Sequence, residues 1–300
     1  MNNDIDLVIP YVDSTDKNWQ DLFDKYNPIS DKEIEGINAR NRFRGQGEFF
    51  KYWFRAVQSY MPWIRKIHLV VQSESQIPTW LNREEIHIVY HKDIIPEEYL
   101  PTFNSTCIEM FLWRIDGLSE RFIYANDDFY PINNLKPDYF FENNLVKNNS
   151  MCTKFNNTMY QHHCLNAYCL AFNCSSANVK NILLYRHCMR PYLRSHMEKS
   201  FIAKQEEILN TLTRFRDTKN INIYYFDNCL IKDNLQKPRL NINSKCITNN
   251  TSSEDMRSII YSSCNMLAIQ DCALNENVYE NFTLNNLFRN KFPYKSKYEK

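Results

Sequence analysis

The sequence predicts an α/β fold with a mostly parallel sheet. Short apolar runs rich in β-branched and aromatic residues alternate with longer segments in which apolar residues recur at helical spacing. Through the first 125 residues the order is strand, helix, strand, strand, helix, strand, which is typical of α/β proteins. Acidic turn residues follow the first and the last of these strands. Because open α/β sheets bind ligands at the carboxyl ends of their strands, we expect a functional site at that edge.

The composition limits the class of protein. The chain has 300 residues, 43% of them hydrophobic and 14% aromatic, which is enough for a core in one large domain or two ordinary ones. Lysine plus arginine number 36 and aspartate plus glutamate 35, so the net charge gives no argument for a nucleic-acid partner. We see neither a membrane-spanning run nor a signal peptide, and therefore expect a cytoplasmic protein whose ten cysteines are free thiols.

The first strand is predicted at residues 5–9 and ends at Pro10. Asp13 and Asp16 follow in a loop at its carboxyl end. Thr15 or Asp16 is placed to cap the next helix, and capping is the more common role of such an aspartate, whereas the role of Asp13 is open on local grounds.

A basic segment precedes the second predicted helix, which spans residues 48–60. It contains Arg42 and Arg44, and guanidinium groups beside a helix N-terminus are suited to binding an anion. A solvated basic loop is the equal alternative. The chain has only four glycines and lacks both glycine-rich phosphate-binding motifs, so a phosphate must be held by arginines, side-chain donors or a helix N-terminus.

Two further strands are predicted at residues 66–71 and 86–90, followed by a proline-containing loop and a helix over residues 107–117. Asn104 and Ser105 stand just before that helix and are strong candidates for its N-cap.

The strand predicted at residues 122–125 is the element around which we expect the site to form. Its short apolar run predicts burial on both faces, and it ends in Asn126, Asp127 and Asp128. Adjacent carboxylates repel each other unless a cation or a basic side chain lies between them. Taken alone, a solvated acidic turn is the more common explanation of such a pattern.

The second half of the chain has a different texture. Residues 131–160 are rich in asparagine and are predicted as an irregular cover over the site, and residues 162–212 as largely helical. Pro191 is placed in the first turn of a helix, with His187 and Arg190 just before it.

The remaining signals are weak one by one. Arg216 lies in a second basic turn, and residues 232–257 are predicted to be polar and mobile. Residues 266–271 are predicted as a short strand that ends in the carboxylate of Asp271, and residues 284–292 as a helix.

Together these segments resemble the Stealth proteins, which are sugar-1-phosphate transferases of bacterial capsule synthesis related to the animal N-acetylglucosamine-1-phosphotransferase. Four blocks carry the resemblance, and they cover most of the chain. They are residues 5–16 with IDLVIPYVD, residues 40–141 with IPTWL, LPTFNS and FIYANDD, residues 187–201 together with RFR at residues 214–216, and residues 267–300, which end in FPYKSKYEK.

The resemblance implies a Rossmann-like or GT-A-like sheet whose site is completed by a helical C-terminal portion. It divides the chain into a nucleotide-sugar-binding α/β region at residues 1–141 and a mainly helical remainder at residues 142–300, which together form one catalytic unit. The implied reaction moves a sugar 1-phosphate from a nucleotide-sugar, typically a UDP-hexose or UDP-N-acetylhexosamine, to a glycan hydroxyl in surface polysaccharide synthesis. It forms a phosphodiester and releases UMP.

The resemblance also implies which residues form the site. The implied catalytic residues are Asp127, Asp128, His187 and Arg216, and the implied substrate-binding residues are Asp13, Arg42, Arg44, Asn104, Ser105, Arg190 and Asp271. Asp127 and Asp128 would hold Mg²⁺ or Mn²⁺ against the diphosphate. We favour His187 as the base that takes the proton of the acceptor and Asp128 as a metal or positioning carboxylate, with an exchange of these roles left open.

Two alternatives stay open. One is a metal-dependent glycosyltransferase that releases UDP. The other is a non-catalytic glycan-binding protein that stacks sugars on its aromatic residues, although a neutral-sugar lectin has no use for the arginine clusters. The acceptor is expected to be a glycan or a lipid-linked glycan. A basic C-terminal segment leads to the hypothesis of peripheral association with the inner membrane face; its lysines are Lys291, Lys295, Lys297 and Lys300.

Overall fold

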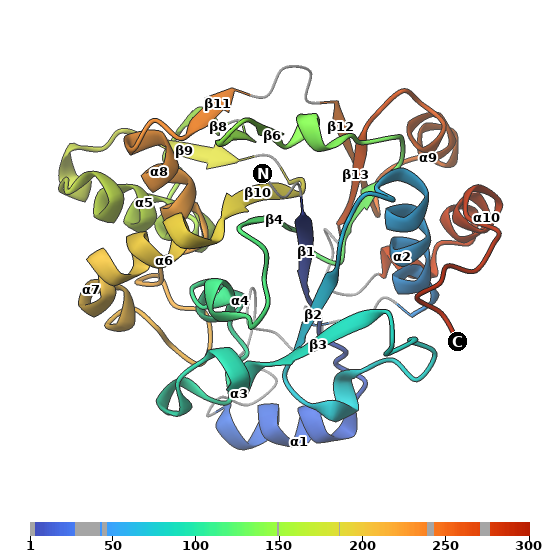
Figure 1. Ribbon diagram of the computed structural model, residues 1–300, viewed down its shortest axis with the longest axis horizontal. Coiled ribbons are helices and arrows are strands. Elements are labelled where there is room, and N and C mark those ends of the chain that lie inside the picture. The colour runs from blue at the N-terminus through green and yellow to red at the C-terminus, as the bar shows by residue number, and fades with distance from the viewer. Residues whose placement is uncertain are drawn as a thin grey trace.

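The computed structural model describes residues 4–27, 43, 47–148, 150–185, 187–238, 243–270 and 277–300. A five-stranded sheet lies at its centre (Figure 1). The strands are β1 (Ile5–Pro10), β2 (Ile67–Val71), β3 (Ile86–Tyr90), β4 (Arg121–Tyr124) and β10 (Arg190–Leu193). Their order is β10-β4-β1-β2-β3. Strands β1, β2, β3 and β4 are parallel, and β10 is antiparallel to β4. The predicted α/β fold with a mostly parallel sheet is confirmed.

Helices cover the sheet on both sides. Those in the described residues are α1 (Lys17–Tyr26), α2 (Glu48–Tyr60), α3 (His91–Ile94), α4 (Ser105–Glu109), α5 (Met159–Phe172), α6 (Arg194–Ala203), α7 (Gln205–Leu209), α8 (Tyr224–Lys232), α9 (Ser253–Ile260) and α10 (Phe282–Lys291). In Figure 1, α2 and α10 lie on one side of the central strands, and α4, α6 and α8 lie on the other. The predicted cap of α1 is confirmed, because the Asp16 carboxylate accepts hydrogen bonds from the backbone N–H groups of Asn18 and Trp19.

The strands of this sheet are nearly continuous apolar runs because most of their residues are buried on both faces. The polar exceptions in β1 and β2 are Asp6 and His68, which are fully buried and pair with each other at 2.9 Å between Oδ2 and Nε2. Arg65 Nε and Ser119 N also donate to the Asp6 carboxylate, each at 2.8 Å. A buried carboxylate with this many donors is stable, and His68 serves as one of its buried partners.

The helix predicted at residues 107–117 is shorter than expected. α4 begins at Ser105, one residue after the N-cap Asn104, and ends at Glu109; a 3₁₀ turn follows at Leu112–Arg114. The three consecutive residues 110–112 are each at most 1% exposed. A helix with only one face on the core cannot bury three successive side chains, so packing overrides the local helical pattern here.

The helix predicted to start around Pro191 is also wrong in its position. Arg190–Leu193 is strand β10, and α6 begins only at Arg194. β10 pairs with β4, so that Pro191 lies opposite Ile123. Proline is accepted there because β10 is the edge strand of the sheet, where one side of the strand has no neighbour to receive an N–H group.

The strand predicted at residues 266–271 is confirmed as β13 (Met266–Gln270). Further strands occur where the sequence predicted none. They are β5 (Phe129–Pro131), β6 (Phe141–Glu142), β7 (Leu145–Asn148), β8 (Ser150–Lys154), β9 (Asn181–Tyr185), β11 (Gln236–Pro238) and β12 (Ser244–Thr248). Together with β13 they form three small sheets, β11-β7-β6, β12-β13-β5 and β8-β9. The second half of the chain therefore contributes strands as well as helices, and through β10 it completes the central sheet. Within the described ranges, each helix is too short or too polar to span a bilayer.

Candidate active site

The carboxyl edge of the central sheet brings together two acidic loops that are far apart in the sequence. Asp13 follows β1, and Asp127 follows β4, whose pairing with β1 continues through a 3.0 Å hydrogen bond from Ala125 N to Val8 O. Burial, together with the nearby charges of Asp13 and Asp127, raises the pKa of the Tyr11 phenol. The two loops therefore meet around this tyrosine, as the parallel sheet predicts.

Asp13 is held by its own turn. Its Oδ1 accepts hydrogen bonds from Thr15 N at 2.9 Å and from Thr15 Oγ1 at 2.7 Å, and its backbone N–H donates to Gln76 Oε1 at 2.7 Å. These contacts fix the loop at the site. A direct contact of Asp13 with substrate stays a prediction.

Asp127 and Asp128 have raised pKa values at the carboxyl edge of the sheet. Both residues are partly exposed, yet burial by the surrounding protein atoms raises the pKa of Asp127 to about 7. Burial and the neighbouring Asp127 raise the pKa of Asp128 well above its ordinary value. Among the described residues, the buried Oδ1 of Asp128 has no hydrogen-bond partner. Two carboxylates in this state favour a cation or a proton between them.

This donor set fits a hard divalent cation. Asp127 and Asp128 offer carboxylate oxygens only, which Mg²⁺ and Mn²⁺ prefer, and one of those oxygens is unused. No group of three or more metal-ligating side chains occurs within the described ranges. Mg²⁺ is commonly held by one or two carboxylates together with water and substrate phosphates, so two are sufficient.

Arg190 comes to the same edge from β10, where it lies opposite Tyr124 at the end of β4. It is buried, its guanidinium carbon lies 4.0 Å from the ring centroid of Tyr224, and its Nη1 lies 3.2 Å from Asp227 Oδ2. Asp227 also accepts a 2.6 Å hydrogen bond from the Tyr192 hydroxyl. These contacts hold a permanent positive charge beside the acidic turn.

Arg216 arrives in a loop that is tied to α4. Its Nη2 donates to Ser105 Oγ at 3.0 Å. Asn104 is fully buried, and its Nδ2 donates to Asn220 Oδ1 at 2.9 Å and to Thr213 O at 3.0 Å. Asn104 therefore joins α4 to the loop that carries Arg216. Contacts of Asn104 and Ser105 with substrate stay predictions.

Glu109 is a site residue to which the sequence assigned no role. It is buried at the end of α4, where Oε1 accepts a 2.8 Å hydrogen bond from the Tyr124 hydroxyl. Burial raises the pKa of Glu109, while the charges of Arg190 and Arg216 act in the opposite direction. Glu109 thus lies between the two arginines and the strand that ends in the acidic turn. The signal in the sequence is a lone carboxylate in an otherwise apolar segment, which requires a buried partner.

His187 stands beside the acidic turn with its ring exposed to solvent. Its ring centroid is 5.9 Å from that of Phe129, the residue after Asp128, and 6.5 Å from that of Tyr160. The surrounding protein atoms and the charge of Arg190 lower the pKa of His187. The imidazole is therefore neutral at pH 7 and able to accept a proton.

Three predicted substrate-binding residues, Arg42, Arg44 and Asp271, lie outside the described residues. The strand before Asp271 ends at Gln270, and the N–H of Ile269 donates to Asp128 O at 3.0 Å.

Known proteins with similar sequences align along most of this chain. Residues 42–149 match the family model of Stealth protein CR2, conserved region 2. The exopolysaccharide phosphotransferase cps2G of Lactiplantibacillus plantarum is 30% identical over 336 residues, which cover 99% of this chain and 96% of that protein. The capsular polysaccharide phosphotransferase WcwK of Streptococcus pneumoniae is 30% identical over 336 residues, which cover 100% of both chains.

A solved structure of the galactosyltransferase LgtC, in complex with donor and acceptor sugar analogs, covers 97% of this chain and 98% of its own. It has a TM-score of 0.45 and 10% sequence identity, and no chemistry follows from so distant a likeness. The relatives with similar sequences are enzymes of the transferase class and align along the whole chain. The chain belongs to the Stealth family of polysaccharide phosphotransferases.

Proposed function

We propose that this enzyme transfers a sugar 1-phosphate from a nucleotide-sugar to a hydroxyl of a glycan, which forms a phosphodiester and releases UMP. The donor is a UDP-hexose or UDP-N-acetylhexosamine, and the acceptor is a surface polysaccharide or its lipid-linked precursor. One observation carries the proposal. A carboxylate pair with raised pKa values lies at the same sheet edge as two arginines, and Tyr124 and Glu109 connect the two groups.

The arginines match the charge of such a reaction. In the transfer, the acceptor oxygen forms a bond to the phosphorus that bears the sugar, and the bond from that phosphorus to the oxygen of UMP breaks. Catalysis of phosphoryl transfer rests on positioning and on stabilising negative charge. Arg216 can form two parallel hydrogen bonds to phosphate oxygens, and the buried charge of Arg190 adds positive potential at the same edge; together they replace the glycine-rich loop that this chain lacks.

His187 is the proposed base. Because its pKa is lowered, it is neutral near pH 7, and its exposed ring is within reach of an incoming hydroxyl. The proton of the acceptor moves to this imidazole as the new bond forms. Asp127, with a pKa of about 7, is the alternative base.

Asp127 and Asp128 are the proposed holders of Mg²⁺ or Mn²⁺. When bound, the cation neutralises charge on the diphosphate of the donor. The two carboxylates favour cation binding, because a positive charge relieves the repulsion between them.

A cytoplasmic enzyme at the inner membrane face would meet a lipid-linked acceptor, and we include this location in the proposal. The C-terminal lysines offer less charge to lipid than their number suggests. Lys297 Nζ lies 2.9 Å from Glu85 Oε2, and Lys300 Nζ donates to Thr79 O at 2.9 Å. Lys295 Nζ donates to Lys300 O at 3.1 Å, within the segment itself. We therefore expect Lys295→Gln to weaken sedimentation with anionic vesicles by at most about fivefold, equivalent to about 1 kcal/mol. Unchanged sedimentation would remove this lysine from the proposed contact.

The identity of the released nucleotide tests the reaction. Purified protein with Mg²⁺, a panel of UDP-sugars and a glycan acceptor should release UMP. Asp128→Asn and His187→Ala should abolish the release, whereas the matched surface variants Asp21→Asn and His162→Ala should keep it. Release of UDP would identify a glycosyltransferase and contradict phosphodiester formation. Release of neither nucleotide across the full panel would also count against the proposal.

A further inference from the structure

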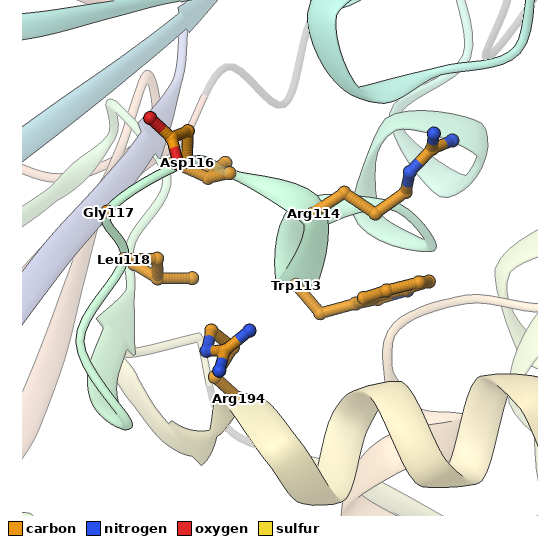
Figure 2. Close-up of a pocket in the computed structure, with 7 residues that line it drawn as sticks. Trp113, Arg114, Asp116, Gly117, Leu118 and Arg194 are labelled. Atoms are coloured by element: carbon orange, nitrogen blue, oxygen red, sulfur yellow. The ribbon is translucent and has the colours of Figure 1, made fainter.

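An open pocket of about 530 Å³ lies at the edge of the central sheet opposite the candidate active site (Figure 2). Leu118 in its wall precedes β4, and Arg194 follows β10. Because β10 is antiparallel to β4 and Leu193 pairs with Arg121, both wall residues lie at the amino end of β4. The acidic turn lies at the carboxyl end of the same strand. The pocket is therefore separate from the site described above.

The side chains of this pocket suit a sugar and an anion together. Trp113 is partly exposed, and its indole N–H already donates to Met110 O at 3.1 Å, so the ring presents chiefly apolar surface to the pocket. Aromatic rings of this kind pack against the apolar faces of sugars. Arg114 is exposed, and the Arg194 side chain is 40% exposed. Its ion pair with Glu198 is long, at 3.9 Å, which leaves guanidinium N–H groups able to donate to a ligand.

One acidic residue also lines the pocket. In Figure 2 the Asp116 carboxylate points away from Trp113 and Arg194. Its charge acts instead on His87 of β3, where it opposes the lowering of the His87 pKa by burial. In the same view the Arg194 guanidinium lies on one side of Trp113, and the Arg114 side chain extends away on the other, with its guanidinium carbon 6.0 Å from the ring centroid of Phe111. The two arginines therefore flank Trp113.

We propose that this pocket binds the growing polysaccharide through its phosphodiester groups, as a second site for the acceptor. Trp113 packs against a sugar ring, and Arg114 and Arg194, which flank it, each bind one of the phosphates that link this sugar to its neighbours. The inference rests on the proposed function, because that reaction places phosphodiesters in the acceptor. A neutral glycan would use the tryptophan but not the arginines.

The position of the pocket fits this role. β10 joins the two sites, with Arg190 in one and Arg194 beginning α6 at the other. Four residue steps along extended strand place the Cα atoms of Arg190 and Arg194 roughly 13 Å apart. A chain of a few sugar units can span such a separation, so an acceptor held at the pocket can present its end to the active site. The expected consequence is a preference for acceptors that already carry several phosphodiester-linked units.

Kinetics with acceptors of two lengths test the proposal. The double variant Arg114→Gln/Arg194→Gln is compared with the wild-type enzyme, with one acceptor of a single repeat and one of many repeats. We expect KM for the long acceptor to rise about tenfold, because a charge-assisted contact is lost. KM for the short acceptor and kcat for both should not change. Arg257→Gln, an exposed arginine on α9, is the matched control and should behave as wild type. Equal KM values in the double variant and wild type would overturn the second site.

A binding measurement without donor separates this inference from the reaction. Calorimetry is carried out with a synthetic phosphodiester-linked oligosaccharide and with a dextran oligosaccharide of matched length. Wild type should bind the first at least about tenfold more tightly than the second, and the double variant should lose that difference. This result would stand even if no UDP-sugar gave UMP. Equal binding of the neutral and anionic oligosaccharides, or equal binding by both proteins, would overturn it.

Discussion

Arg190 is a buried cation at the candidate active site, and its neighbours account for how it stays there. Asp227 is fully buried and provides the opposite charge, and Tyr224 provides an aromatic face under the guanidinium. Asp227 is itself satisfied by the Tyr192 hydroxyl and by Asn148 Nδ2 at 2.7 Å. A buried ion pair adds little net stability, but removal of one partner leaves an uncompensated charge.

Asp227→Asn should therefore destabilise the protein by about 3 kcal/mol, because Arg190 loses its counterion while the volume is kept. The same change should lower kcat/KM, since Arg190 is no longer held toward the donor phosphates. Urea unfolding measures the first effect and UMP release the second. Asp233→Asn removes the partly exposed partner of His196 and should cost less than about 1 kcal/mol. Equal losses of unfolding free energy in the two variants would contradict the inference that Asp227 is the essential counterion of Arg190.

His187, as the proposed base, should give the reaction a pH dependence whose sign follows from its environment. Its pKa lies below the ordinary 6.5 because the neighbouring atoms and Arg190 disfavour the cation, and Tyr160 and Phe129 add no charge of their own near pH 7. Below its pKa the imidazole is protonated and cannot accept a proton. With Mg²⁺ at a concentration that keeps Asp127 and Asp128 ionised, we expect kcat/KM to be flat through neutral pH and to fall only below pH 6.5.

A pH profile of kcat/KM from pH 5 to 8 checks this assignment. If Asp127 were the base instead, the acid limb would lie near its pKa of about 7. His187→Ala should lower kcat by about 10²- to 10⁴-fold and remove the limb, while His162→Ala should leave both unchanged. A limb that survives His187→Ala would assign the proton to another group.

At the scale of elements, local sequence patterns predict those strands and helices whose limits do not depend on contacts with distant segments. β3 and α2 occupy the predicted residues, and β1, β2 and β4 lie within one residue of theirs, because buried parallel strands and a one-sided helix leave plain periodicities. β10 could not be found this way. Its residues pair with β4, more than 60 positions earlier, and the edge position that admits Pro191 is a property of the assembled sheet.

The candidate site divides along the same line. Asp13, Asp127 and Asp128 follow strands, so the carboxyl edge of a parallel sheet predicts them. Glu109 and Asp227 can be recognised as site residues only from their contacts in the folded structure. Each is a buried carboxylate whose role comes from residues that tertiary packing brings to it, Tyr124 for one and Arg190 for the other. No local spacing encodes such a contact, although a lone acid in an apolar segment signals that one exists.

The C-terminal segment is an element of the fold rather than a free basic tail. Glu299 is held by a bidentate pair with Arg55 of α2, at 2.8 Å from Nε to Oε1 and 2.6 Å from Nη2 to Oε2. The Glu299 side chain is 3% exposed, and Tyr298 is buried beside it. Burial alone would raise the pKa of Glu299, but Arg55 and Ser296 lower it below its ordinary value.

Glu299→Gln should therefore destabilise the protein by about 3 kcal/mol at pH 7. The folded-state pKa is lowered, so the ionised carboxylate stabilises the fold above the ordinary value of 4.5, and that contribution is lost as the pH falls through the folded pKa. The difference between variant and wild type in urea unfolding should thus shrink in strong acid. Glu142→Gln, in an exposed pair with Lys237, is the control and should leave the free energy of unfolding nearly unchanged, because exposed ion pairs add little stability. A difference that does not depend on pH would contradict the ionic origin.

At the scale of the whole molecule, the site exists only when both halves of the chain are folded together. β1, β4 and α4 bring Asp13, the acidic turn and Glu109, whereas β10 and the loop after α7 bring Arg190 and Arg216. Every charged group meant for the donor depends on the central sheet being complete. A ligand that contacts groups from both halves should therefore stabilise the entire structure and not one region of it.

Thermal unfolding with donor and cation tests this coupling. At a donor concentration about 100 times its Kd, a UDP-sugar with Mg²⁺ should add about 2.7 kcal/mol and raise Tm by roughly 5 °C in one transition. Removal of Mg²⁺ with a chelator should abolish most of the rise, and so should Asp127→Asn/Asp128→Asn. Without donor, that double variant should be at least as stable as wild type, because it removes two carboxylates that repel each other in a crowded site. Asp21→Asn should respond as wild type. A double variant with lower Tm that still gains the full donor shift would show that the acidic turn supports the fold and not the diphosphate.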